Sequence, residues 1–345
     1  MARYRILVTD AKYADDGEIE KRLSGPEYEW TICRATTAEE LPADILESCD
    51  GILTWHVLRY DPAVVERLKR CRIIVRAGVG YDHIDLQATA AAGIPVSNTP
   101  DYGTMEVADH ALAMALVLGR GLLRYHTELL ADPLAGFNTA RSMGQRRLSG
   151  QTFAVLGIGR IGTAAALRAK AFGFRVLCYD PYASRGTERA LGIERTDSLQ
   201  DLLSQADILS LHAPLTEETR NIINRDTVAW LKPGAILVNT ARGGLVDPAV
   251  VVDAIRDGKL AAAGLDVFPK EPIDPATPWY RCWVEQPEWL RGRLLLSPHT
   301  AWLADESRAD ARSKAVETLI AYLERGELRN CVNGLTAETA RTFEA

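Results

Sequence analysis

The sequence of 345 residues lacks the features that mark membrane, secreted and nucleic-acid-binding proteins. No apolar run reaches the roughly 18–20 residues that a membrane-spanning helix needs, and the N-terminus has no basic-then-apolar signal layout. An excess of positive charge is also missing, since 40 Lys and Arg residues stand against 46 Asp and Glu. These absences predict a cytoplasmic protein that binds neither a membrane nor nucleic acid.

Disulfide and metal-ligand spacings are absent as well. The six cysteines are scattered without a C-x-x-C pair, and no two histidines follow the H-E-x-x-H pattern of zinc sites. We therefore expect reduced, structural thiols and no metal site. Four of the six histidines have no functional signal in their surroundings: His83, His110, His126 and His212.

What the sequence does contain is an alternation of short β-branched runs with helical patterns. Candidate strands lie at 5–10, 51–55, 72–76 and 94–98, and in a second series at 152–157, 175–180, 207–212, 235–240, 261–267 and 294–297. Near-continuous apolar strands separated by helices are typical of parallel sheets covered on both faces. Two such series predict an α/β protein with two doubly wound parallel-sheet domains.

Two long helical patterns suggest how these domains are connected. Residues 104–130 link the two series as one helix, and residues 304–327 follow the last strand and can return to the first domain. We therefore expect a discontinuous domain, residues 1–101 plus 298–345, with residues 102–297 inserted as the second domain.

The segment 272–293 is unusual because it holds three of the seven tryptophans and four of the sixteen prolines. Two interpretations are open for it. It is either a flap that only covers its domain, or a lid that narrows the active site or reaches a partner subunit.

Residues 155–162, VLGIGRIG, have the glycine spacing of a dinucleotide-binding turn between a strand and a helix. Gly157 permits the tight turn, Gly159 permits close approach of a diphosphate, and Gly162 permits close packing of helix on strand. The next strand ends at Asp180, where a carboxylate can accept both ribose hydroxyls and would repel a 2′-phosphate. This combination predicts an NAD site.

Three further residues each follow a candidate strand: Arg242 in NTARGGLVD, Glu271 in DVFPKEP and His299 in SPHTAW. Ligands of doubly wound sheets bind at these strand ends. Reduction of a 2-keto acid needs a guanidinium fork for the carboxylate, a proton donor such as histidine, and a carboxylate to orient that histidine. Each residue taken singly is also compatible with a structural role.

Together these motifs resemble the D-2-hydroxyacid dehydrogenases over nearly the whole chain. The resemblance implies a Rossmann NAD domain inserted into a flavodoxin-like substrate domain, a homodimer, and interconversion of a 2-keto acid and a D-2-hydroxy acid. It implies that Arg242 binds substrate, Glu271 orients His299, and His299 is the general acid/base. To the cofactor site it adds Arg160, Ile161, Thr240 and Asp266, the last near the nicotinamide amide.

Within that family the chain is most similar to the C-terminal-binding-protein branch, on segments 72–85, 166–203 and 330–333. This similarity implies that the backbone amides near Val79 and Gly80 receive the substrate carboxylate. It implies three further pocket residues: Arg76 as a second cation, Trp302 facing the substrate side chain, and His56. For Trp302, a packing role at the start of a helix is an equal alternative.

An alternative to the enzyme is an NAD(H)-sensing, corepressor-like binding protein with vestigial chemistry. The printed sequence ends at Ala345, without the long disordered tail of the animal members of that branch, and it retains Arg242, Glu271 and His299. Both observations favour the enzyme. Trp302 suggests a keto acid with an apolar side chain, although the sequence leaves glyoxylate open.

Overall fold

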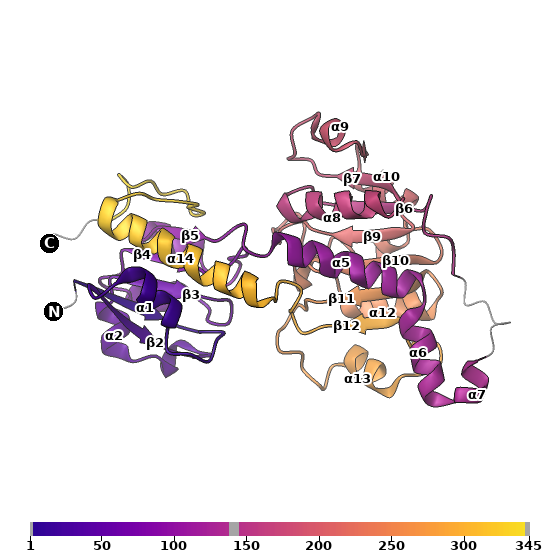
Figure 1. Cartoon of the computed structure of the whole chain (residues 1–345), viewed down its shortest axis with the longest axis horizontal. Coiled ribbons are helices and arrows are strands. Elements are labelled where there is room, and N and C mark those ends of the chain that lie inside the picture. The colour runs from indigo at the N-terminus through magenta and orange to yellow at the C-terminus, as the bar shows by residue number, and fades with distance from the viewer. Residues whose placement is uncertain (1–2, 138–144, 342–345) are drawn as a thin grey trace. The chain divides into compact units, whose positions relative to one another are not determined.

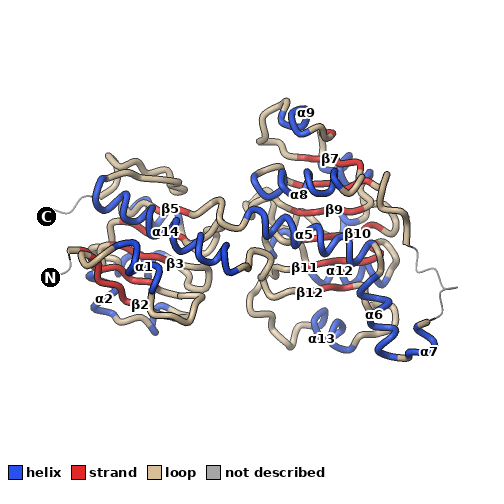
Figure 2. The backbone as a smooth tube through the Cα atoms, viewed as in Figure 1, coloured by secondary structure: helices blue, strands red, loops and turns tan. Residues whose placement is uncertain are grey.

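The computed structural model describes residues 3–137 and 145–341. The chain divides into two compact units, Met1–Gly103 with Leu303–Ala345, and Thr104–Trp302 (Figure 1). Each unit contains one parallel β-sheet with helices around it (Figure 2). In the described residues no helix is both long and apolar enough to cross a membrane.

The first unit is built on a five-stranded sheet of order β2-β1-β3-β4-β5. Its strands are β1 (Tyr4–Val8), β2 (Tyr28–Ile32), β3 (Gly51–Thr54), β4 (Ile73–Arg76) and β5 (Val96–Asn98). Its helices are α1 (Glu18–Ser24), α2 (Ala43–Ser48), α3 (Pro62–Arg67), α4 (Leu86–Ala91) and α14 (Asp305–Arg325). The order 2-1-3-4-5 is that of flavodoxin-like folds.

Strand β2 was not among the expected strands. It lies at the edge of the sheet, and of its residues only Tyr28 is buried. Glu29 and Thr31 interrupt the apolar run that would have signalled a strand, because an edge strand needs less apolar surface than a central one.

A buried ion cluster ties α14 to the first unit. The guanidinium of Arg312, 4 % exposed, donates to both carboxylate oxygens of Glu20 on α1, at 2.9 and 2.5 Å. It also donates to Asp15 at 2.8 and 2.7 Å and lies 3.6 Å from the ring centroid of Tyr13. Because a buried carboxylate is costly unless paired, this cluster favours the return of the chain to the first sheet.

The second unit is built on a seven-stranded sheet of order β12-β11-β10-β9-β6-β7-β8. Its strands are β6 (Thr152–Leu156), β7 (Arg175–Tyr179), β8 (Glu194–Arg195), β9 (Ile208–Leu211), β10 (Ala235–Asn239), β11 (Leu260–Leu265) and β12 (Leu294–Leu296). Counted from β6, the order is the Rossmann order 3-2-1-4-5-6 with one more strand. The predicted fold class is confirmed.

Helices cover both faces of this sheet. Along β6, Phe153 and Val155 belong to one buried cluster, whereas Ala154 and Leu156 belong to another. The helices of this unit are α5 (Thr104–Gly119), α6 (Leu122–Ala131), α7 (Pro133–Gly136), α8 (Arg160–Ala171), α9 (Thr187–Leu191), α10 (Leu199–Gln205), α11 (Arg225–Val228), α12 (Pro248–Arg256) and α13 (Pro278–Glu285). Burial on both faces explains the near-continuous apolar strands.

The prediction of one helix over residues 104–130 is wrong. Helix α5 ends at Gly119, Gly121 has a φ of 65°, and α6 begins at Leu122. A left-handed residue cannot continue a right-handed helix, so the chain changes direction at this glycine.

The tryptophan-rich segment 272–293 forms α13 and packs on its own unit. Trp279 stacks on Phe268, with ring centroids 5.9 Å apart and an angle of 12° between the planes. Trp283 donates its indole N–H to the Leu294 carbonyl at 3.0 Å, and Trp289 packs on the same core. These contacts support the interpretation of a covering flap.

Candidate active site

The carboxyl edge of the seven-stranded sheet collects most of the predicted site residues. All its strands are parallel, so the residues that follow them lie at the same edge. In sheet order these are Asp180 after β7, the glycine turn after β6, Thr240 and Arg242 after β10, Asp266 and Glu271 after β11, and His299 after β12. The strand order reverses between β6 and β9, which is where doubly wound folds bind ligands.

The glycine turn packs closely against the protein at Gly157 and Gly162, whereas space is open at Gly159. Gly157 has a φ of 90°, and a Cβ there would lie 2.8 Å from the Ala213 nitrogen. A Cβ at Gly162 would lie 2.0 Å from the Gly157 carbonyl oxygen, so only glycine allows α8 to pack this closely. At Gly159, which caps α8, no atom lies within 4 Å of such a Cβ. This opening at a helix N-terminus fits a diphosphate.

Asp180 is held next to this turn. Its Oδ2 accepts the Ile158 amide at 2.9 Å, and its Oδ1 accepts the amides of Tyr182 and Ala183 at 2.9 and 3.1 Å. Three backbone amides fix the carboxylate at the end of β7. A negative charge is therefore fixed directly after the strand, next to the Ile158 amide that precedes α8.

Two buried polar atoms at the same edge lack a protein partner in the described residues. They are Oγ1 of Thr240 and Nδ1 of His212, and both follow central strands. The other ring nitrogen of His212 pairs with the Ser210 hydroxyl at 2.9 Å. Buried polar atoms normally have partners, so both atoms fit a site that a ligand completes. Burial lowers the pKa of His212 to about 4, so this ring is neutral around pH 7.

Glu271 and His299 form a hydrogen-bonded pair. His299 Nδ1 lies 2.7 Å from Glu271 Oε2, and Glu271 Oε1 accepts the Phe268 amide at 2.8 Å. A carboxylate only accepts, so Nδ1 carries the proton and Nε2 is the nitrogen that can exchange one with a ligand. Both side chains are partly exposed, at 24 % for His299 and 29 % for Glu271.

Asp266 builds the turn that carries His299. Its carboxylate is fully buried and accepts the Ser297 hydroxyl at 2.5 Å, the Thr300 amide at 2.9 Å and the Ala301 amide at 3.0 Å. Its carbonyl accepts the His299 amide at 2.7 Å. The expected contact of Asp266 with the nicotinamide amide stays a prediction. Ser297, which sequence reasoning missed, has no local signal because it resembles any polar residue at a strand end.

Arg242 and Glu271 lie on loops that touch. A Cβ at Gly243, next to Arg242, would lie 1.9 Å from the Phe268 carbonyl carbon, so the two loops are in close contact. Arg242 Nη1 donates to the Ala241 carbonyl at 2.6 Å. The arrangement puts a guanidinium on the loop that packs against the loop of the Glu271–His299 pair, and it can hold an anionic substrate near the proton donor.

The other predicted substrate residues lie in the first unit, except for Trp302, which ends the second. Arg76 is 5 % exposed, and its guanidinium donates to the carbonyls of Ala77 and Gly80. Arg76 therefore shapes the loop that contains Val79 and Gly80. The part of these residues in substrate binding stays a prediction.

His56 lies on the neighbouring loop, after β3. Buried Asp10 anchors this loop by accepting the amides of Trp55 and Val57, both at 2.8 Å. The loop therefore has a fixed backbone at the carboxyl edge of the five-stranded sheet.

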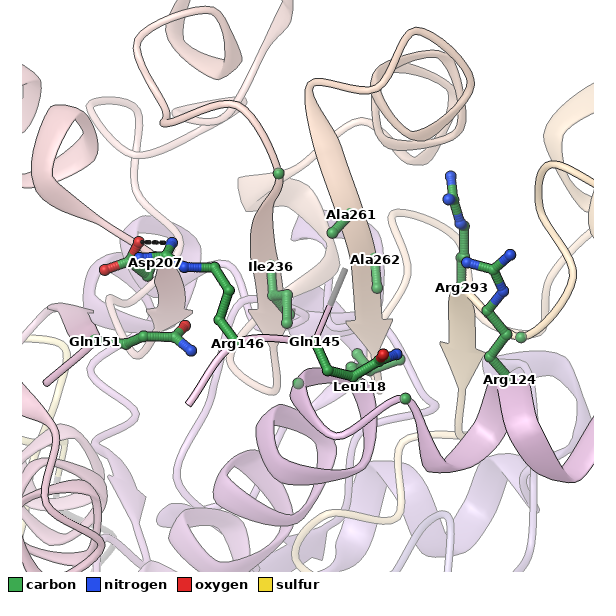
Figure 3. A pocket seen from close by; sticks show the side chains of 14 residues that line it. Leu118, Arg124, Gln145, Arg146, Gln151, Asp207, Ile236, Ala261, Ala262 and Arg293 are labelled. Atoms are coloured by element: carbon green, nitrogen blue, oxygen red, sulfur yellow. Dashed lines mark hydrogen bonds and ion pairs between the residues drawn. The ribbon is translucent and has the colours of Figure 1, made fainter. Parts of the chain in front are cut away.

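A pocket of the second unit lies at the opposite edge of its sheet (Figure 3). Its lining includes Asp207, Gly234 and Arg293, which precede β9, β10 and β12. Arg146 pairs with Asp207 at 2.8 Å, and burial together with the Arg124 charge lowers the pKa of Arg293. This pocket is separate from the predicted site. In the described residues no three metal-ligating side chains gather.

Comparison with known proteins identifies the family. Residues 112–301 match the family model for the NAD binding domain of D-isomer specific 2-hydroxyacid dehydrogenases. The chain belongs to this family. This match confirms the resemblance stated from the sequence. The matched residues all lie in the second unit, so that unit contains the NAD-binding domain.

Two curated relatives and one solved structure illustrate the relationship. The chain is 33% identical to D-3-phosphoglycerate dehydrogenase of Methanocaldococcus jannaschii over 336 residues, which are 95% of this chain and 59% of that protein. It is 31% identical to C-terminal-binding protein 1 of Caenorhabditis elegans over 309 residues, 88% of this chain and 40% of that protein. The chain thus spans about half the length of these curated relatives.

The solved structure chosen for comparison is that of D-lactate dehydrogenase from Aquifex aeolicus, complexed with NAD and lactic acid. It matches with a TM-score of 0.82 and 30% sequence identity, and the match covers 96% of this chain and 100% of that one. Near-complete coverage shows that the similarity includes both units.

The glycine turn yields a paired prediction. Gly159→Ala should melt like the wild type, because its methyl group meets no protein atom, and should bind NADH at least about 10-fold more weakly, because the methyl group blocks the diphosphate. Gly162→Ala should lower both thermal stability and affinity, because its methyl group meets the Gly157 carbonyl. Thermal melts and NADH fluorescence titrations measure both. Unchanged NADH affinity in Gly159→Ala would place the cofactor elsewhere.

Proposed function

We propose that this protein is an NAD-dependent oxidoreductase that interconverts a 2-keto acid and a D-2-hydroxy acid. The observation that carries the proposal is the 2.7 Å contact of Glu271 with His299, at the same sheet edge as the glycine turn and Asp180. An oriented proton donor beside a dinucleotide site is what the reduction of a carbonyl group requires.

In the proposed mechanism, bound nicotinamide supplies the hydride that C2 of the keto acid accepts. Arg242 holds the carboxylate of the substrate and so orients the carbonyl group. His299 gives the proton to the developing alkoxide oxygen from Nε2. Glu271 stabilises the protonated ring and holds its orientation through the Phe268 amide. Oxidation of the hydroxy acid reverses each step.

We place the substrate carboxylate at the backbone amides of Val79 and Gly80, next to Arg76. The loop that presents them is held by the Arg76 guanidinium and by Asn98, whose Nδ2 donates to the Val79 carbonyl at 2.7 Å. We propose that His56 and Trp302 also take part in substrate binding, and that the indole favours an apolar side chain on the keto acid. The six free cysteines agree with a cytoplasmic location.

An NAD(H)-sensing role without turnover is not favoured. A protein with vestigial chemistry has no need to keep Glu271 on the ring nitrogen of His299. Tight NADH binding with no turnover of any keto acid would support the sensor instead.

The mechanism is tested with a panel of 2-keto acids from glyoxylate to aromatic members, by NADH oxidation at 340 nm. For any member turned over, His299→Asn should lower kcat by about 10²–10⁴-fold with little change in NADH affinity, because the proton donor is lost. Arg242→Met should mainly raise KM for the keto acid. The matched control is Asp201→Asn, at an exposed position of α10 outside the proposed site and the proposed dimer contact. Full activity of His299→Asn would rule out the proposed mechanism.

Cofactor choice gives a separate prediction. Asp180→Asn keeps an oxygen for the Tyr182 and Ala183 amides but removes the charge that repels a 2′-phosphate. We expect the ratio of kcat/KM with NADH to kcat/KM with NADPH to fall at least about 10-fold, equivalent to about 1.4 kcal/mol. A ratio that does not change would show that this carboxylate does not face the ribose.

We also propose that the protein is a homodimer whose contact includes α6 and α7. Helix α5 buries seven of its residues within its own unit. By contrast, Leu130, Leu134 and Phe137 on and after α6 and α7 are 75 %, 89 % and 78 % exposed. Such apolar exposure is typical of interaction surfaces.

The dimer is tested by sedimentation equilibrium. The wild type should have twice the mass of one chain, and the double substitution Leu130→Glu with Leu134→Glu should shift it toward the monomer. Leu167→Glu, at another half-exposed leucine, is the control and should leave the mass unchanged. A wild-type mass near that of one chain contradicts the proposal.

A further inference from the structure

A chain of hydrogen bonds runs from helix α5 to the turn of His299. His110 Nε2 lies 3.1 Å from the Ser297 hydroxyl, and that hydroxyl lies 2.5 Å from Asp266 Oδ1. The same carboxylate accepts the amides of Thr300 and Ala301. All these residues lie in the second unit.

The chemistry of the groups determines which atom donates in each of these hydrogen bonds. Asp266 is buried and accepts two backbone amides, so the Ser297 hydroxyl gives its single proton to this carboxylate. The serine oxygen then accepts from His110, which must carry a proton on Nε2. His110 Nε2 also lies 3.9 Å from Asp266 Oδ1, and in the described residues no Lys or Arg side chain pairs with Asp266.

Close packing of α5 on β11 brings His110 to this place. A Cβ at Gly264 would lie 2.9 Å from the Met114 sulfur, so the helix approaches the strand closely at that glycine. His110 lies one turn before Met114, about 6 Å along the helix. Asp266 lies two residues after Gly264, about 6.6 Å along the strand. The two distances match, so a histidine on α5 reaches the end of β11.

The turn that depends on Asp266 is strained at His299. Its φ is 55°, a left-handed conformation that residues other than glycine rarely adopt and that is unfavourable unless the surroundings hold it. The backbone is held there because the His299 amide donates to the Asp266 carbonyl, and the next two amides donate to its carboxylate. The direction of the His299 ring toward a substrate therefore depends on where the Asp266 carboxylate lies.

We propose that His110 is a positioning residue for His299, acting through Ser297 and Asp266. Its ring N–H donates to the Ser297 hydroxyl oxygen, which keeps the serine proton directed at the Asp266 carboxylate and so holds the turn in the conformation that presents the imidazole to the substrate. The inference deepens the proposed function, because it assigns a role to a histidine that touches neither His299 nor Glu271 in the described contacts.

The test compares two substitutions of one residue. His110→Phe keeps the ring but has no N–H donor, and His110→Gln keeps an N–H at a similar distance from the backbone. With a keto acid that the wild type turns over, His110→Phe should lower kcat at least about 10-fold, because a general acid displaced by about 1 Å can lose about 100-fold in rate. KM for the keto acid and the Kd for NADH should change less than about 3-fold.

Rescue and coupling separate this role from a merely structural one. His110→Gln should recover kcat to within about 3-fold of the wild type. Adding His110→Phe to Ser297→Ala should cause no further loss, because both changes break the same chain. Asp201→Phe, at an exposed position of α10, is the control and should match the wild type. Full kcat in His110→Phe, equal losses in the Phe and Gln variants, or additive losses with Ser297→Ala would each overturn the proposal.

A second measurement needs no turnover. Hydrogen exchange of the amides of Thr300 and Ala301, in the protein without cofactor, should be faster in His110→Phe than in the wild type and restored in His110→Gln. Unchanged exchange in His110→Phe would overturn the proposal. If the wild type turns over no keto acid, the proposed function fails, while the exchange data still decide whether His110 holds the turn.

Discussion

Parallel pairing of every strand is the constraint on which the rest of this structure depends. Two parallel strands cannot be joined by a tight turn, so each strand is followed by a crossover, and the helices of these crossovers cover both faces of the sheet. The carboxyl ends then all lie at one edge. Residues as distant in sequence as Gly157, Asp180, Arg242 and His299 reach that edge because the strand order brings their loops there. The site is thus a consequence of topology before it is a set of contacts.

Buried charges give the loops at these edges their shape. Asp10 holds the loop of His56, Arg76 holds its own loop at residues 77–80, and Asp266 holds the turn of His299. In each case a charged group with little exposure is surrounded by backbone amides or carbonyls. Leaving such a group without its partners costs about 1–3 kcal/mol or more, so irregular loops become well-defined surfaces. Buried charged groups thereby determine the position of loop residues proposed to bind the substrate.

Family membership sets the cofactor domain, whereas the substrate depends on other parts of the chain. The relatives named above include a D-3-phosphoglycerate dehydrogenase and a D-lactate dehydrogenase, which differ in their named substrates. The residues that match the NAD binding domain model lie in the second unit, but His56, Val79 and Gly80 lie in the first. Substrate choice in our proposal is therefore a property of the first unit and of Trp302. Segment 272–293 packs on the second unit, where Trp279 supports the Phe268 side of the Glu271 loop.

The sequence by itself determined the two doubly wound sheets, the glycine turn and the acidic residue after the next strand. These features depend on local spacing: apolar runs of strand length, three glycines within six residues, and polar residues directly after strands. Two features were not predicted from the sequence. Edge strand β2 buries only one of its residues and so has a weak apolar pattern. The helix break at Gly121 was missed because an apolar pattern can continue across a glycine. Only the tertiary structure decided that Asp266 is enclosed by Ser297 and two amides, and that the Arg76 guanidinium binds its own loop. The hydrogen bond between His110 and Ser297 is also visible only in the tertiary structure, because the two residues are 187 positions apart and no local pattern encodes a contact across that separation.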